Sequence, residues 1–169
     1  MPGSPTDAPP LATHPVAVVQ PDYLWFADLA LGGMARIVED LGDELANRRP
    51  SFPDSNTPYA ILTHCLGVVE YWAGATVAGR SIERDRPAEF TASGPVAPLL
   101  ERAAAAQQRL SDDLHGLDTW SEPQSVRRSP DDPVPYAETK GAVLLHILEE
   151  VFQHLGQMEI TRDVLRAQP

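Results

Sequence analysis

Two histidines and two adjacent acids lie in an otherwise mostly apolar segment near the C-terminus, HILEEVFQH, which runs from His146 to His154. Imidazole and carboxylate groups at this spacing can bind a metal ion or exchange protons. At about 100° per residue, Glu150 and His154 lie on or beside the apolar stripe of a predicted helix, whereas Glu149 points to solvent. Because an ionised carboxylate on a buried face is costly when unpaired, Glu150 is the acid that needs a partner.

The spacing of Glu150 and His154 lets the two side chains act together. They are one helical turn apart, about 6 Å of rise, so both can reach one ion. His146 lies about 12 Å along the axis from His154, too far to share that ion comfortably. We therefore interpret His146 as a surface histidine or as a residue that contacts the metal ligands without binding the metal itself. A buried hydrogen-bonded pair without metal explains Glu150 and His154 equally well.

A third candidate ligand lies in a second apolar segment, NTPYAILTHCLGVVEYW. On the helical wheel, His64 falls at the shoulder of a predicted buried stripe, which consists of Ile61, Cys65, Val68, Val69 and Trp72. Two histidines and a glutamate from two helices would form a three-ligand site for a divalent metal with an open position, as in catalytic zinc centres. Such ligands also accept nickel or iron.

Four predicted helices position these residues. Apolar residues at helical spacing, with helix-starting Ser, Asp and Pro and helix-ending Gly, predict helices over residues 22–47, 57–78, 95–114 and 137–167. The proline-rich stretch before the last helix predicts a long loop, and residues 1–20 lack periodicity and predict an extended or mobile arm. The sequence therefore indicates an all-α protein, with a four-helix bundle over residues 21–169.

Composition argues against several classes of partner. Thirteen basic residues against twenty-four acidic ones give a formal charge of −11, which would repel nucleic acids and anionic membranes. The N-terminus does not resemble a signal peptide, and no apolar run approaches the roughly 18 residues of a membrane span. The single cysteine, Cys65, fits a reducing compartment, so we expect a cytoplasmic protein. Because Cys65 and His64 point about 100° apart, we interpret Cys65 as a buried hydrophobe.

The two segments NTPYAILTHCLGVVEYW and GAVLLHILEEVFQHLGQMEITRDVL resemble the DinB/YfiT-like superfamily of metalloenzymes. The nearest branch includes mycothiol-dependent maleylpyruvate isomerase and related thiol transferases, and the resemblance runs from about residue 22 to the end. It implies a four-helix bundle that often forms a homodimer. It also implies a metal site, usually zinc, held by His64, Glu150 and His154. Other members use three histidines, and the position of their middle ligand is Glu150 here.

The resemblance also implies a chemistry. A thiol at the open position of such a metal would lose its proton near neutral pH, and thiolates are strong nucleophiles. The expected function is S-transfer from mycothiol or another small thiol to a small electrophilic substrate, or isomerisation of that substrate. No catalytic residue beyond the metal centre is expected. Two alternatives remain open: a metal-dependent hydrolase or lyase, and a non-catalytic dimeric bundle for protein interaction or stress response.

Four further residues are candidates for substrate binding. Arg127 and Arg128 lie in the predicted long loop, where they would either clamp a carboxylated ligand or remain solvated surface charge. Tyr71 and Trp25 would wall a pocket near the site. The competing interpretation places these aromatic residues in the core, together with Phe26 and Trp72.

Overall fold

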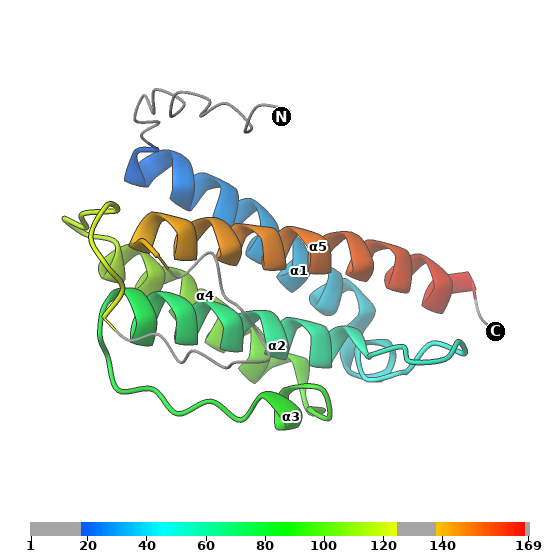
Figure 1. Ribbon diagram of the computed structural model, residues 1–169. Coiled ribbons are helices and arrows are strands. Elements are labelled where there is room, and N and C mark those ends of the chain that lie inside the picture. The colour runs from blue at the N-terminus through cyan, green and yellow to red at the C-terminus, as the bar shows by residue number, and fades with distance from the viewer. Residues whose placement is uncertain (1–17, 125–137, 168–169) are drawn as a thin grey trace, which may run out of the picture.

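The computed structural model describes residues 18–124 and 138–167, and all regular secondary structure in these residues is helical. Four long helices pack as a bundle (Figure 1): α1 (Gln20–Ala46), α2 (Pro58–Val69), α4 (Val96–Asp113) and α5 (Lys140–Ala167). A π-helical segment, η1 (Glu70–Val77), continues α2, and the short helix α3 (Arg86–Glu89) follows it. The predicted all-α fold is confirmed. Most of the predicted arm and the middle of the predicted long loop lie outside the described residues.

Side-chain caps fix the starts of the two helices that carry the histidines and Glu150. The Thr57 hydroxyl accepts a hydrogen bond from the Ala60 N–H at 3.1 Å, and proline follows it in the first turn of α2. The Thr139 hydroxyl accepts from the Ala142 N–H, also at 3.1 Å. Because Thr139 caps the helix, α5 begins at Lys140 and not at residue 137 as predicted.

Helix α1 is not the unbroken helix that the sequence predicts, because Gly42 adopts φ 65° and ψ 179°. Side chains at the end of α1 then accept hydrogen bonds from backbone N–H groups at the start of α4. Asp43 accepts a hydrogen bond from the Val96 N–H at 2.8 Å, and the Asn47 side chain accepts from the Gly94 N–H at 3.0 Å. The apolar pattern runs across Gly42 without a break, so helical periodicity alone does not reveal this interruption.

Packing within the bundle brings α2 and α5, the helices that carry the candidate ligands, into contact. Helix α5 packs against α1, α2 and η1, and α1 also packs against α4 (Figure 1). The largest fully buried side chains come from all four long helices and include Leu31, Met34, Ile61, Leu62, Leu66, Leu110, Ile147 and Met158. No helix within the described residues is both long and apolar enough to cross a lipid bilayer.

Helix α2 is enclosed on nearly every side, although the helical wheel predicted only one buried stripe. All residues from 60 to 69 are buried. The reason is that α3 packs against α2 and covers a further side of it (Figure 1). The segment PYAILTHCLGVV is apolar almost all round, which is the sequence signature of a fully buried helix.

Candidate metal site

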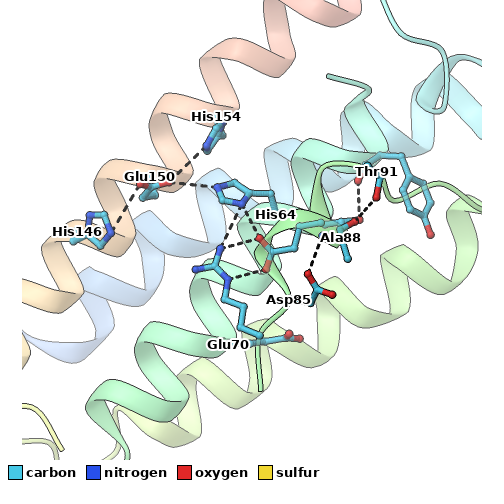
Figure 2. Close-up of polar contacts among 12 residues, drawn as sticks. His64, Glu70, Asp85, Ala88, Thr91, His146, Glu150 and His154 are labelled. Carbon is cyan, nitrogen blue, oxygen red and sulfur yellow. Dashed lines mark hydrogen bonds and ion pairs between the residues drawn. The ribbon is translucent and has the colours of Figure 1, made fainter. Parts of the chain in front are cut away.

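The structure brings His64, Glu150 and His154 together (Figure 2). One oxygen of Glu150, Oε2, lies 3.6 Å from His64 Nε2 and 3.6 Å from His154 Nε2. All three potential ligand atoms lie within 4.8 Å of one another. No other cluster of three or more His, Cys, Asp or Glu side chains in residues 18–124 and 138–167 meets this condition.

The geometry and donor set of these three residues fit a divalent metal ion. Tetrahedral zinc with bonds of about 2.0–2.2 Å to nitrogen and oxygen keeps neighbouring ligand atoms about 3.3–3.6 Å apart. The 3.6 Å separations lie at the upper end of this range, and they are too long for good hydrogen bonds. The three ligand atoms lie within 4.8 Å of one another, and an inward movement of the side chains would enclose an ion. Three protein ligands leave a fourth position open.

The electrostatics of the site favour a cation. His64 is 2% exposed, whereas Glu150 and His154 are half-buried, so the more accessible ligands belong to α5. Contact with His154, and then with His64, holds the pKa of Glu150 well below its usual range. The contact with Glu150 in turn raises the pKa of His154. Glu150 is therefore an anionic ligand at neutral pH, and a metal ion competes with a proton for His154.

In metal-free protein, we expect the contact between Glu150 and His154 to stabilise the fold most between about pH 4.5 and 6.5. With its pKa lowered, Glu150 contributes above its ordinary value of 4.5, and the contribution is lost as pH falls. With its pKa raised, His154 contributes fully below its ordinary value of 6.5, and the contribution is lost as pH rises through the raised value. Urea unfolding of wild type and His154→Gln at a series of pH values measures the difference. A difference that does not vary with pH would contradict the assignment.

On the side away from Glu150, the His64 ring is held by residues that come after α2 in the chain. His64 Nδ1 lies 2.8 Å from Glu89 Oε2, and the Phe90 ring stacks on the imidazole with centroids 4.5 Å apart. Arg84 donates to both Glu89 oxygens, at 2.7 Å to Oε1 and 2.8 Å to Oε2. None of these residues was predicted from the sequence. Asp85, which caps α3 by accepting from the Ala88 N–H at 3.1 Å, is a signal for the helix but not for the contact with His64.

His146 is buried, so its interpretation as a surface histidine is wrong. It is 8% exposed and lies edge-on to Trp72 of η1, with ring centroids 5.2 Å apart. Its Nδ1 is 3.2 Å from Glu149 Oε2, and its Nε2 is 3.9 Å from Glu150 Oε1 (Figure 2). His146 therefore faces the oxygen of Glu150 that does not face His64 and His154. The helical wheel placed it at the margin because it does not include cover from another helix.

Of the remaining candidates, the structure describes Tyr71 and Trp25, which lie in different surroundings. Tyr71 lies edge-on to Trp72, and the Arg84 guanidinium sits 5.9 Å from its ring centroid, so Tyr71 adjoins the arginine that holds Glu89. Trp25 is 61% exposed on α1 beside Phe26, which is also exposed, so the core interpretation is wrong for both. Arg127 and Arg128 lie outside the described residues.

Cys65 is the buried hydrophobe that the sequence predicts. Burial, and then the negative charge of Glu150, raises the pKa of its thiol. We expect the thiol in folded protein at about pH 8 to react with Ellman's reagent far more slowly than the thiol in urea-unfolded protein. The time course of absorbance after mixing measures this. Complete modification of folded protein at the unfolded rate would show that the thiol is accessible.

A cavity of about 250 Å³ opens between α2, α3 and α4. Its lining includes Thr63, Gly67, Arg84 and Glu89, but none of the three candidate ligands. The ion pair of Arg84 and Glu89 therefore contributes both to this cavity and to the support of His64.

The fold and the three converging side chains define a helical-bundle protein with a candidate metal site. The family model of the DinB superfamily matches residues 28–158, a range that includes all three candidate ligands. The chain belongs to the DinB superfamily. Comparison with curated proteins found no match, and comparison with solved structures found none.

Proposed function

We propose that the protein is a metal-dependent enzyme that activates a small thiol for S-transfer to, or isomerisation of, a small electrophilic metabolite. The observation that carries the proposal is the convergence of His64, Glu150 and His154, whose ligand atoms lie within 4.8 Å of one another. The resemblance to the branch with mycothiol-dependent maleylpyruvate isomerase supports thiol chemistry and makes mycothiol the first candidate. A divalent ion, with zinc preferred over nickel or iron, would lower the pKa of a thiol or water held at its open position.

The chain's own residues prepare the site for this role. His154 Nδ1 lies 2.8 Å from the side-chain oxygen of Gln157, which accepts a hydrogen bond from Nδ1–H. This leaves Nε2 as the ligand atom. Glu89 and Phe90 contact the His64 ring on the side away from Glu150. Glu150 supplies negative charge between the imidazole rings of His64 and His154. The partial exposure of Glu150 and His154 leaves access for a substrate on the α5 side.

The proposed reactions share attack by the thiol sulfur and differ in their later steps. Attack on an electrophilic carbon forms a carbon–sulfur bond and breaks the π bond of an activated alkene or a carbon–oxygen bond of an epoxide. The atom that receives the electron pair takes up the proton that the thiol lost, which completes S-transfer. Addition to a conjugated double bond, rotation about the resulting single bond and elimination of the thiol give cis–trans isomerisation. In both cases the site must bind the sulfur and the substrate together, which is the positioning that makes such steps fast.

Thiol consumption in the presence of electrophiles tests the proposal. Metal-loaded protein should consume mycothiol, glutathione or bacillithiol with at least one activated alkene or epoxide, and His64→Gln should not. Treatment with a chelator should remove the activity, and added metal should restore it. If the protein binds one metal per chain, consumes none of these thiols and isomerises no conjugated cis-alkene in their presence, thiol activation is wrong, and metal-dependent hydrolysis or lyase chemistry takes its place.

We also propose that the protein is a cytoplasmic homodimer, as the family resemblance implies. Exposed aromatic rings on α1 and α5 support a contact surface there. The ring centroids of Phe26 on α1 and Phe152 on α5 lie 6.3 Å apart, and Trp25 adjoins Phe26. Sedimentation equilibrium should give twice the chain mass for wild type and the single mass for Phe152→Glu. A wild type that stays monomeric at about 100 μM contradicts the dimer, since stable dimers have far lower dissociation constants.

A further inference from the structure

We propose that Glu89, held in place by Arg84, is a positioning residue that fixes the metal-binding tautomer and the ring orientation of His64. The inference rests on the metal site proposed above, and it concerns residues that belong neither to the candidate ligands nor to either helix that carries them. Glu89 lies on α3, and Arg84 lies in the chain just before α3.

The hydrogen bond between His64 and Glu89 determines which imidazole nitrogen faces the candidate metal position. His64 Nδ1 and Glu89 Oε2 are 2.8 Å apart, and both side chains are almost fully buried. A carboxylate only accepts hydrogen bonds, so the 2.8 Å contact places the proton on Nδ1. Arg84 Nη2, which only donates, lies 3.4 Å from the same nitrogen, and this longer contact is the weaker of the two. The lone pair of His64 is then on Nε2, the atom 3.6 Å from Glu150 Oε2. Carboxylates behind metal-binding histidines orient the ring and raise its basicity in this way.

Arg84 keeps the Glu89 carboxylate in the position that this role requires. Its guanidinium donates to both carboxylate oxygens of Glu89, at 2.7 Å and 2.8 Å, in a bidentate pair. Glu89 is 6% exposed, and a carboxylate buried to that extent is strongly destabilising without a cationic partner. Arg84 therefore holds Glu89 in place, so that its Oε2 can accept a hydrogen bond from His64 Nδ1–H.

Gly67 shows that α2 leaves space for this carboxylate. A Cβ atom at position 67 would lie 2.1 Å from Glu89 Oε1 and 2.7 Å from its Cδ, distances that no side chain tolerates without displacing Glu89. Gly67 comes one helical turn after His64, so the missing side chain opens the helix surface beside the histidine. A glycine at this position is needed for the close approach of Glu89 to α2.

Two variants test the role, each with a matched control. Glu89→Ala removes the acceptor, and Gly67→Ala displaces it without changing any charge. Glu83→Ala removes an exposed acid from the same connecting segment, and Gly32→Ala places a methyl group in α1 against only the tip of Arg36. Zinc affinity, measured by competition with a chromogenic chelator, should fall about 10–100-fold in the first two variants and stay within about twofold in the controls.

The tautomer gives a second readout that a merely structural role would not move. Long-range ¹⁵N–¹H spectra of metal-free wild type should show His64 protonated at Nδ1, and the spectra of Glu89→Ala should show a tautomer mixture. Glu89→Gln tests rescue, because its amide oxygen still accepts from Nδ1. It should recover most of the zinc affinity that Glu89→Ala loses. Far-UV circular dichroism confirms that each variant is folded.

The possible results separate this inference from the proposed thiol chemistry. Unchanged zinc affinity in folded Glu89→Ala and Gly67→Ala, or His64 protonated at Nε2 in wild type, would overturn the positioning role even if thiols are consumed. Weakened zinc binding in both variants, with no thiol consumed and no thiol-dependent isomerisation by wild type, would support the positioning role and reject thiol activation. If the loss in Glu89→Ala appears only as a lower melting temperature, the Arg84–Glu89 pair is structural and the inference is wrong.

Discussion

Glu150→Gln is expected to weaken zinc binding by more than about 100-fold. This loss exceeds the one usual for changing a residue that hydrogen-bonds to a metal ligand but does not itself bind the metal. The Oε2 atom of Glu150 is 3.6 Å from the Nε2 atoms of both His64 and His154, so it lies between the other two ligands. Glutamine keeps the size of the side chain but removes the negative charge that attracts the cation. Competition with a chromogenic chelator at neutral pH and constant ionic strength measures the affinity of both proteins.

The neighbouring acid provides the control for this prediction. Glu149→Gln makes the same change of charge one residue away on the same helix, but Glu149 is exposed and contacts His146 and Gln153 rather than the candidate ligands. Its zinc affinity should remain within about twofold of wild type, the scale expected for a charge in solvent. Equal losses in Glu149→Gln and Glu150→Gln would mean that general negative charge, and not coordination by Glu150, binds the ion.

Zinc is expected to stabilise wild-type protein strongly and His64→Gln hardly at all. The candidate ligands come from α2 and α5, so the complete site exists only when these helices are packed together. Free zinc at one hundred times its dissociation constant adds about 2.7 kcal/mol to the free energy of unfolding. For a chain of this size, that corresponds to a rise of about 5–11 °C in the melting temperature.

Thermal unfolding followed by circular dichroism, with and without zinc, measures this second prediction. His115→Gln serves as the control, because His115 is exposed just beyond α4 and is absent from the candidate site. The control should show the full rise in melting temperature. If zinc stabilises His64→Gln as much as wild type, the ion binds elsewhere on the folded protein.

The sequence predicted the candidate ligands because their arrangement follows helix geometry. Glu150 and His154 share a face through their four-residue spacing, and Glu149 turns away from it, as the structure shows. His64 required more than periodicity, because nothing in its own helix specifies which helix it will face. The family resemblance linked the two segments, and the packing of α2 against α5 brings them together.

Contacts made across loops were beyond the reach of the same reasoning. Glu89 is 25 residues from His64, and its position depends on how the segment before α4 crosses α2. Spacing along a helix says nothing about such a crossing. The burial of His146 was missed for a related reason: the ring of Trp72 covers it from η1, and no wheel of α5 contains that ring.

Backbone irregularities were also missed, because they leave the apolar pattern intact. The helix predicted over residues 57–78 is continuous, but its last turns are π-helical, with the Ala78 N–H donating to the Ala73 carbonyl at 2.9 Å. A π-helical turn shifts the faces of the residues it contains, and such turns occur frequently near functional sites. Here the segment includes Tyr71 and Trp72, which contact Arg84 and His146.

Anomalous diffraction from crystals grown with zinc, recorded on both sides of the zinc absorption edge, tests the central claim most directly. We expect one strong peak per chain within about 2.3 Å of His64 Nε2, His154 Nε2 and a carboxylate oxygen of Glu150. Zinc bound only at other side chains, with these three groups still in mutual contact, would contradict the metal site.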